Sequence, residues 1–443
     1  MNRSAHALLV RLLLGLALLA MAGCVRADPV DAAEAGGDGE APTTVILISM
    51  DGTRPADLTE ERLPALLALA REGARAERLV PVDPTNTFPS HVSLATGVRP
   101  EKHRLVNNRF HDPLRGRFSR DAPHTWIESE PIWSIAERHD VPSASYYWVG
   151  SEGPWQGGPG PRETRRFSSR TSEKRKVTQI LAWLDEADPA RRPRLITSWF
   201  HGADHAGHVS GPDSPEVTRQ LAPQDRQIAR LVRELEARDL FASTTLLIVS
   251  DHGMALASER VNLGVLLDRA GVEAAVLGIG GFATIVFEDD ERSEAAIARA
   301  VAVAREAGLE ASRRTRAPAD WHVGDPRFGD VVVRAPVGVA IVTRTTLIDG
   351  FHGYPGTAPE MGAVLVARGR GVRVGASLGV VSALQIAPTV LRLLDLPVPA
   401  QMTAPPIDGL LDGIGRPDDA PKAERPRAAK GSGPSVPIGR EAR

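Results

Sequence analysis

At 443 residues, the chain is longer than the ~100–200 residues of an average domain and can bury a large core. Its residues are 42% apolar and 24% charged, which is the composition of an ordinary soluble globular protein. The formal net charge of -2 excludes a surface field that would recruit nucleic acid wholesale, so we expect no stable nucleic-acid partner.

Residues 1–24 are predicted to be an export signal. Arg3 precedes an apolar run, Leu12–Ala22, that is too short to span a bilayer comfortably. The run ends at Cys24 in a pattern that resembles a bacterial lipobox, which predicts a periplasmic or cell-envelope lipoprotein anchored to the membrane through Cys24. The alternative is a plain signal peptide cleaved near Ala27. Cys24 is the only cysteine, so disulfides and thiolate zinc sites are excluded in the mature protein.

The expected folded body covers residues 43–414. Residues 25–42 are rich in Ala, Gly, Asp and Glu without periodicity and are predicted to form a flexible tether. Residues 415–443 are rich in Pro, Ala, Lys and Arg and are predicted to be a disordered tail.

Within the body, short apolar runs alternate with amphipathic stretches, which predicts an α/β fold with a mainly parallel sheet flanked by helices. The apolar runs are continuous, as expected for strands that are covered on both faces. Strands are predicted at Val45–Ile48, Ser143–Trp148, Leu195–Ser198 and Thr245–Val249. Helices are predicted from Leu63 to Ala70 with a stop at Gly73, from about 171 to 186, from about 214 to 238, and from Leu384 with Pro388 in the first turn.

Residues from about 262 to 342 have a different pattern. A strand is predicted at Phe282–Phe287, a helix at Ser293–Ala307 and another strand at Asp330–Arg334. The simplest interpretation is a small α+β subdomain inserted into the main sheet, which we expect to cap or flank the functional site.

Acidic and histidine side chains follow three of the predicted strands. Because ligands of doubly wound sheets bind outside the carboxyl ends of the strands, these side chains can converge on one crevice. Asp and His are the ligands expected for zinc in a hydrolytic site, and two such ions ~3.5–4 Å apart can clamp a phosphoryl group. The set is Asp51, Asp204, His208, Asp251 and His252, with His352 arriving after the inserted subdomain.

A candidate nucleophile is Thr87, in the segment Thr87–His91. Pro89 suits the first turn of a helix, whose N-terminus presents free N–H groups to an anion. Taken alone, Thr87 could equally be a helix-capping threonine. Asp51 and Asp251 could similarly begin ordinary turns, and His208 and His352 could be surface histidines.

Taken together, the motifs resemble the nucleotide pyrophosphatase/phosphodiesterase family of the alkaline phosphatase superfamily. The resemblance covers roughly Thr44 to Leu396. Its matching blocks are Ile48–Gly52, Thr87–His91, Thr96-Gly97 with Pro100-Glu101 and His103, Tyr147–Ser151, Asp204–His208, Asp251–Met254 and His352–Tyr354.

The resemblance implies an alkaline-phosphatase-like fold and a zinc-dependent hydrolase that cleaves phosphodiester or pyrophosphate bonds through a covalent phosphothreonine at Thr87. Nucleotides and dinucleotide-type molecules are the first substrate expectation, and lipid-derived or polar-headgroup diesters are the next. The resemblance also implies that Asn108, with the backbone N–H of Thr87, stabilises the phosphate oxygens, and that Phe88 stacks on the base. Two Zn²⁺ ions are implied: one on Asp204, His208 and His352, and the other on Asp51, Asp251, His252 and the Thr87 oxygen. Manganese or iron would also suit such ligands.

The sequence departs from the family pattern at several positions. None of the following four is an expected ligand: Ser90, Arg104, Ala203 and Pro355. In addition, residues 150–167 contain no Tyr to complete the family's aromatic clamp around the base, which puts the nucleotide preference in doubt.

Two alternative functions remain. One is a phosphomonoesterase of the same superfamily, which would often add an arginine clamp or a third metal that the sequence does not identify. The other is a catalytically silent lipoprotein that binds zinc or an anion. A sulfatase is excluded, because no Cys-x-Pro-x-Arg-like motif is present.

Overall fold

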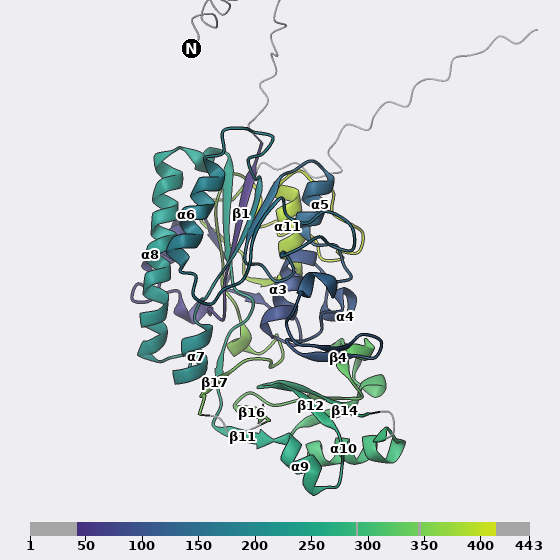
Figure 1. Ribbon diagram of the computed structural model, residues 1–443. Coiled ribbons are helices and arrows are strands. Elements are labelled where there is room, and N and C mark those ends of the chain that lie inside the picture. The colour runs from purple at the N-terminus through teal and green to yellow at the C-terminus, as the bar shows by residue number, and fades with distance from the viewer. Residues whose placement is uncertain (1–41, 289–290, 344–346, 413–443) are drawn as a thin grey trace, which may run out of the picture. The chain divides into compact units, whose positions relative to one another are not determined.

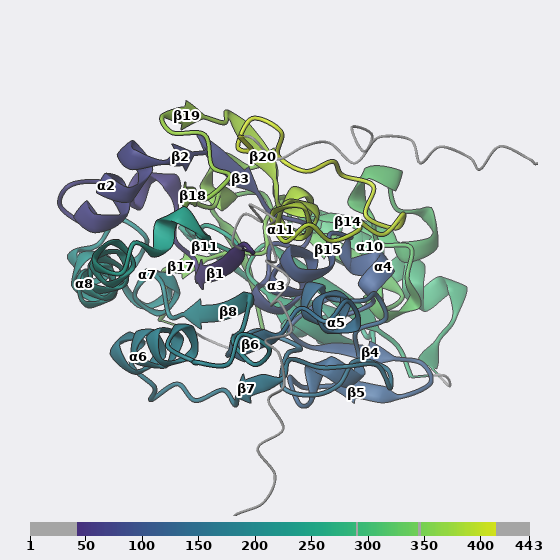
Figure 2. The same ribbon diagram turned by 90° about the horizontal axis from the view of Figure 1, so that it is seen from above.

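A mixed sheet of eight strands, in the order β19-β2-β18-β9-β1-β8-β6-β7, organises the main body (Figures 1 and 2). At its middle, β1 (Thr44–Met50) pairs in parallel with β8 (Leu195–Phe200) and β9 (Thr244–Val249). β6 (Ser143–Tyr146) continues the parallel part, whereas β18 (Leu365–Gly369) is antiparallel to β9. The prediction of a mainly parallel sheet is therefore confirmed.

This computed structural model describes residues 42–288, 291–343 and 347–412. The predicted signal of residues 1–24 with Cys24, nearly all of the predicted tether, and the predicted tail of residues 415–443 lie outside these ranges. Among the described residues, none of the helices combines the length and the apolar composition that crossing a bilayer requires.

Helices cover both faces of the sheet, which explains the continuous apolar run of β1. Val45 and Leu47 point into one core with α3 (Thr87–Thr96), α5 (Ile132–Arg138) and α11 (Ile386–Leu393). Ile46 and Ile48 point into the other with α2 (Pro64–Glu72), α6 (Glu173–Leu184) and α8 (Pro215–Ala237). Figure 2 shows these two helix layers on opposite sides of the strands.

Most predicted boundaries lie close to the observed ones. Gly73 caps α2 and Pro388 lies in the first turn of α11, as predicted. The strand predicted to reach Trp148 ends at Tyr146 instead, because Tyr147 adopts a left-handed backbone with φ 59° that a strand cannot accommodate.

The inserted subdomain is built on a four-stranded antiparallel sheet in the order β12-β13-β15-β14. Helices α9 (Leu263–Arg269) and α10 (Glu294–Glu306) pack against it in a separate apolar core. The segments that enter and leave it, β11 (Glu259–Asn262) and β16 (Val339–Val342), pair with each other in parallel. Figure 1 shows the subdomain beyond the end of the main sheet where α7 lies. Its strands are β12 (Ala275–Ile279), β13 (Phe282–Val286), β14 (Glu310–Arg313) and β15 (Val331–Arg334).

A short hairpin of β4 (Phe110–Asp112) and β5 (Gly116–Phe118) lies between the main body and the subdomain (Figure 1). The remaining elements are β2 (Ala74–Arg75), β3 (Arg78–Val80), α4 (Pro100–His103), β7 (Glu163–Arg165), α7 (Asp204–Ser210), β10 (Ala255–Leu256), β17 (Gly350–Phe351), β19 (Ala376–Ser377) and β20 (Val380–Ser382).

Candidate metal centre

The carboxyl ends of the three central strands bring the predicted acidic residues together. Asp51 follows β1, Asp204 begins α7 just after β8, and Asp251 follows β9. Because β8, β1 and β9 are adjacent and parallel, these positions meet at one edge of the sheet.

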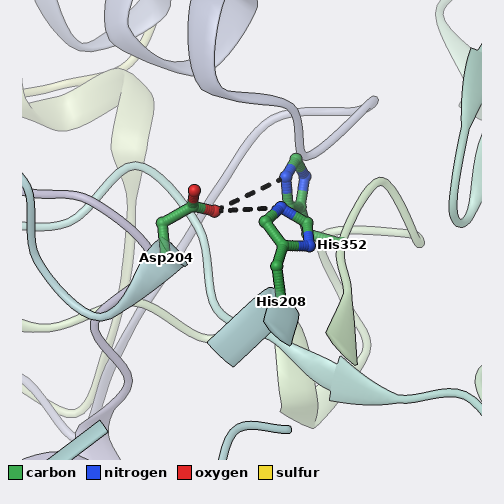
Figure 3. A group of neighbouring side chains, drawn as sticks. All are labelled: Asp204, His208 and His352. Carbon is green, nitrogen blue, oxygen red and sulfur yellow. Dashed lines mark ion pairs between the residues drawn. The ribbon is translucent and has the colours of Figure 1, made fainter. Parts of the chain in front are cut away.

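The first candidate metal group consists of Asp204, His208 and His352 (Figure 3). The Nε2 atoms of His208 and His352 lie 3.2 Å and 3.8 Å from Asp204 Oδ1. Each histidine has its Nδ1 hydrogen-bonded to a backbone carbonyl at 2.8 Å, His208 to Gly350 and His352 to Thr85. A neutral imidazole that donates from Nδ1 leaves the Nε2 lone pair free for a metal.

The second group consists of Asp51, Asp204 and His252, so Asp204 belongs to both groups. His252 Nε2 lies 3.4 Å from Asp51 Oδ1 and 3.2 Å from Asp251 Oδ2. Its Nδ1 lies 2.8 Å from the carbonyl oxygen of Gly253, which again orients Nε2 toward the carboxylates. The predicted second set has Asp251 where this group has Asp204, and Asp251 lies beside it through its contact with His252.

The chemistry of these atoms fits divalent cations. Asp51 Oδ1, Asp204 Oδ1 and Asp251 Oδ2 are buried without a hydrogen-bond donor among the described residues. Asp51 Oδ1 and Asp204 Oδ1 face imidazole Nε2 atoms, which carry no proton when Nδ1 donates. Asp251 Oδ2 lies 3.2 Å from His252 Nε2 and 3.3 Å from His91 Nδ1. A cation between these atoms would stabilise such an arrangement.

The electrostatics of two of the residues agree with this fit. Burial, followed by repulsion from Asp251 and Asp204, raises the pKa of Asp51 well above its ordinary 3.8. Burial, followed by repulsion from His252 and His208, lowers the pKa of His352 well below 6.5 and keeps its imidazole neutral. Bound cations would favour both the ionised Asp51 and the neutral His352.

Thr87 is the first residue of α3, and its hydroxyl Oγ1 lies 3.2 Å from His252 Nε2. The helix-capping alternative is wrong, because Asn86 occupies the N-cap position. As the first helical residue, Thr87 also has a backbone N–H without an intrahelical acceptor. The structure thus places the hydroxyl beside the second metal group.

Asn108 is oriented by Phe88, the residue that follows Thr87. Its Oδ1 accepts the backbone N–H of Phe88 at 2.8 Å, and only the oxygen of an amide can accept. The Nδ2 group, with two N–H donors, is therefore the part left to contact a substrate in the cavity that Asn108 lines.

A cavity of about 1050 Å³ contains the predicted site. Asp251 and His252 do not line it, because they are buried beneath its floor. Residues of the inserted subdomain, including Leu277 and Ile279, form part of its wall, as expected for a flanking subdomain. The predicted residues on its surface are Asp51, Thr87, Phe88, Asn108, Asp204, His208 and His352.

Phe88 has both a packing role and an exposed face. It is half-buried, with its ring centroid 6.2 Å from that of Phe118. The guanidinium of Arg120 lies 5.7 Å from the Phe88 ring centroid, so this ring also contacts a cation. Its predicted role in base stacking stays a prediction.

Sequence reasoning missed two aromatic residues. Trp199 Nε1 donates to Asp51 Oδ2 at 3.0 Å, which leaves only Oδ1 of that carboxylate free. Phe167 is 60% exposed, lines the cavity and stacks on Trp199 with centroids 5.3 Å apart. Phe167 is the last residue of the segment 150–167, which contains no Tyr, so its aromatic ring is the signal that the sequence offers. No motif indicates Trp199.

Comparisons with known proteins agree with the fold and the motifs. The family model for type I phosphodiesterase / nucleotide pyrophosphatase matches residues 45–355. An uncharacterized pyrophosphatase/phosphodiesterase of Schizosaccharomyces pombe is 32% identical over 399 residues, covering 84% of this chain and 79% of that protein. Mouse ectonucleotide pyrophosphatase/phosphodiesterase family member 3 is 34% identical over 217 residues, which cover 47% of this chain and only 25% of the mouse protein.

The fold also matches a solved structure. Murine ectonucleotide pyrophosphatase/phosphodiesterase 5, as an inactive variant in complex with AMP, superposes with a TM-score of 0.74 at 24% identity, covering 81% of this chain and 96% of that one. This likeness confirms the alkaline-phosphatase-like fold. The chain belongs to the type I phosphodiesterase/nucleotide pyrophosphatase family, a family of phosphoric diester hydrolases.

Proposed function

We propose that this chain is a zinc-dependent hydrolase that cleaves phosphodiester or pyrophosphate bonds of nucleotides, with Thr87 as the nucleophile. One observation carries the proposal: the Thr87 hydroxyl lies 3.2 Å from His252 Nε2, beside buried carboxylate oxygens without donors, at the floor of a large cavity. A nucleophile next to a cation site is what attack on a phosphoryl group requires.

In this reaction Thr87 loses its proton to solvent, forms a bond from Oγ1 to phosphorus and displaces the leaving oxygen, which takes a proton from solvent. Water then attacks the phosphothreonine, breaks the bond between Oγ1 and phosphorus, and returns a proton to Thr87. The Nδ2 donors of Asn108 and the N–H of Thr87 stabilise the charge on the phosphoryl oxygens. Two divalent cations on these ligands would supply charge stabilisation and lower the pKa of the attacking hydroxyl.

Zinc is the proposed metal because the ligands are imidazoles and carboxylates in two overlapping groups. Asp204, His208 and His352 would hold one ion. Manganese and iron suit the same donors, so metal analysis of the purified protein is needed alongside the assays.

Nucleotides are the proposed substrates because the cavity offers aromatic surfaces near the nucleophile. Phe88 follows Thr87, and the exposed ring of Phe167 lines the same cavity. The AMP complex of the murine protein of the same fold supports a nucleotide.

The test compares bis-p-nitrophenyl phosphate with p-nitrophenyl phosphate, in the zinc-loaded protein with and without chelator. We expect preference for the diester and loss of activity on chelation. Thr87→Ala should lower kcat by at least about 1000-fold, whereas Thr87→Ser retains a hydroxyl and should keep measurable turnover.

The other outcomes separate the alternatives. Preference for the monoester would identify a phosphomonoesterase. No turnover of either substrate would identify a silent zinc-binding or anion-binding protein.

We also propose that the chain is exported and anchored by a lipid on Cys24. The support is the sequence of residues 1–24 alone, since these lie outside the described residues. Cys24→Ser should move the protein from the membrane fraction to the soluble fraction of the envelope, and an unchanged distribution would contradict the anchor.

A further inference from the structure

The helix that carries Thr87 is capped from another part of the chain. An asparagine at the N-cap position normally uses its side-chain oxygen to accept the N–H of the second or third helical residue. Asn86 occupies this position in α3, but within the described residues its side chain makes no capping hydrogen bond. The N–H of the second helical residue, Phe88, is accepted instead by Asn108 Oδ1 at 2.8 Å.

α3 offers a single N–H to a capping side chain. The third helical residue is Pro89, which has no N–H, so the Phe88 N–H is the one that either Asn86 or Asn108 can accept. The two asparagines therefore compete for it. If Asn86 accepted this N–H, the Asn108 amide would lose the hydrogen bond that leaves its Nδ2 group for a ligand in the cavity.

Asn107 determines the outcome of this competition through one oxygen atom. Its Oδ1 accepts Asn86 Nδ2 at 2.8 Å and the backbone N–H of Asn108 at 2.7 Å. The first bond holds the Asn86 amide in a contact other than the cap, and the second fixes the backbone that carries the Asn108 side chain. Because Asn86 and Asn107 are both buried, breaking their bond would leave polar atoms without water to replace it.

The arrangement also determines which N–H groups of α3 remain for a ligand. The first N–H groups of a helix lack intrahelical acceptors. That of Asn86 donates to a carbonyl of the preceding loop at 2.7 Å, and that of Phe88 is taken by Asn108. Since Pro89 has none, the N–H of Thr87 is the one that remains among the described residues. It belongs to the residue whose hydroxyl is the proposed nucleophile, and with Asn108 Nδ2 it forms a pair of donors for phosphoryl oxygens.

Asn107 takes part in this network through its oxygen alone. Its Nδ2 is buried and has no hydrogen-bond partner in the part of the chain that the structure describes. A carboxylate at this position would keep the acceptor and remove only the unused donor. Aspartate is therefore the conservative replacement, whereas alanine removes the acceptor.

We propose that Asn107 is a positioning residue for phosphoryl transfer: by holding Asn86 away from the helix cap, it leaves the Phe88 N–H to Asn108 and orients the Asn108 amide toward the reacting phosphoryl group. This inference rests on the proposed function. It gives Asn86 and Asn107 a role in activity that is separate from the stability of α3.

The test uses the zinc-loaded full chain and bis-p-nitrophenyl phosphate. Asn107→Ala removes the acceptor and Asn107→Asp keeps it. Asn86→Ser is too short to reach Asn107 but provides a good, uncharged cap for α3. The control is Asn262→Ser, because Asn262 is the N-cap residue of α9, its side chain does accept an N–H of its own helix, and it lies outside the cavity.

We expect Asn107→Ala and Asn86→Ser to lower kcat by about 10- to 100-fold and to change KM by less than about 3-fold, because a displaced donor loses its effect mainly in the transition state. Asn107→Asp should stay within about 3-fold of the unmodified kcat, and Asn262→Ser should change neither constant. Asn86→Ser should keep the thermal midpoint within about 2 °C, since Ser caps a helix as well as Asn does. A purely structural role would lower stability and activity together. Should Asn107→Ala fail to fold, Asn86→Ser provides the same comparison.

A double-mutant cycle tests whether Asn107 acts through Asn108. Asn108→Ala should lower kcat by about 100- to 1000-fold, and adding Asn107→Ala should lower it no further, because the amide that Asn107 orients is already absent. Additive losses would show that Asn107 acts on another group and would overturn the proposal. A normal kcat in Asn86→Ser, or the same loss in Asn107→Asp as in Asn107→Ala, would overturn it as well.

The design also separates this inference from the proposed function. If the unmodified chain hydrolyses only p-nitrophenyl phosphate, the proposed function fails, and the same variants are compared with that monoester. If neither substrate is hydrolysed, calorimetric titration with inorganic phosphate replaces turnover. Asn107→Ala should then bind phosphate about 10-fold more weakly than Asn107→Asp and Asn262→Ser. Equal affinities, or no phosphate binding by the unmodified chain, would refute the inference.

Discussion

Trp199 belongs to no motif, but it sets the orientation of the Asp51 carboxylate, which is a proposed metal ligand. Its indole N–H occupies Asp51 Oδ2, so the carboxylate cannot rotate freely and presents Oδ1 to the second metal group. The Trp199 ring is itself held between His91, with centroids 4.9 Å apart, and Phe167. The side chain that orients Asp51 is thus fixed by aromatic packing.

We expect Trp199→Phe to weaken zinc binding by about 10-fold, because it removes the hydrogen bond to Asp51 but keeps an aromatic ring. Chelator competition on the purified protein measures the affinity. Trp155→Phe is the matched control, since it removes an indole hydrogen bond to the carbonyl of Ile127 outside the cavity. Equal affinities of the two variants would show that Trp199 does not orient the ligand.

At the scale of elements, the turn between β8 and α7 depends on Gly202. This residue has φ 54°, and a Cβ built on it would lie 1.9 Å from the carbonyl oxygen of Asp51. The ends of β1 and β8 therefore lie so close together at Gly202 that a side chain does not fit between them. The same contact sets the spacing between Asp51 and Asp204.

Gly202→Ala should force these two segments apart and abolish zinc binding by both groups. Gly271→Ala is the control, because Gly271 also has a left-handed φ, 67°, but open space around its Cβ. The control should cost only the backbone strain of about 1–2 kcal/mol in urea unfolding and leave zinc titration unchanged. A Gly202→Ala protein that binds zinc as tightly as the control would contradict this account.

The sequence predicts well both the elements and the convergence of the acidic residues, because both depend on local patterns. Asp51 and Asp251 directly follow buried apolar strands, and parallel pairing then brings them together without further information. Trp199 and Phe167 escape such reasoning because their role arises from contacts with residues distant in the chain.

Across the whole molecule, the metal groups join segments that are far apart in the chain. Asp51 follows the first strand, whereas His352 comes after the inserted subdomain and is fixed by the carbonyl of Thr85. Cations that bind these converged ligands would bind the native state and not the unfolded chain. Binding should therefore stabilise the native state by RT ln(1 + [L]/Kd), about 2.7 kcal/mol at a hundredfold excess over Kd.

We expect zinc at that excess to raise the thermal midpoint by about 3 °C and a chelator to remove the increase. Asp204→Asn should lose most of this shift, because Asp204 belongs to both groups. Thr87→Ala should keep most of it even though its activity is lost, since the other ligands remain. If Asp204→Asn kept the full shift, zinc would be bound elsewhere. If Thr87→Ala lost the zinc-induced thermal shift together with activity, the hydroxyl would be needed to assemble the metal centre as well as to attack phosphorus.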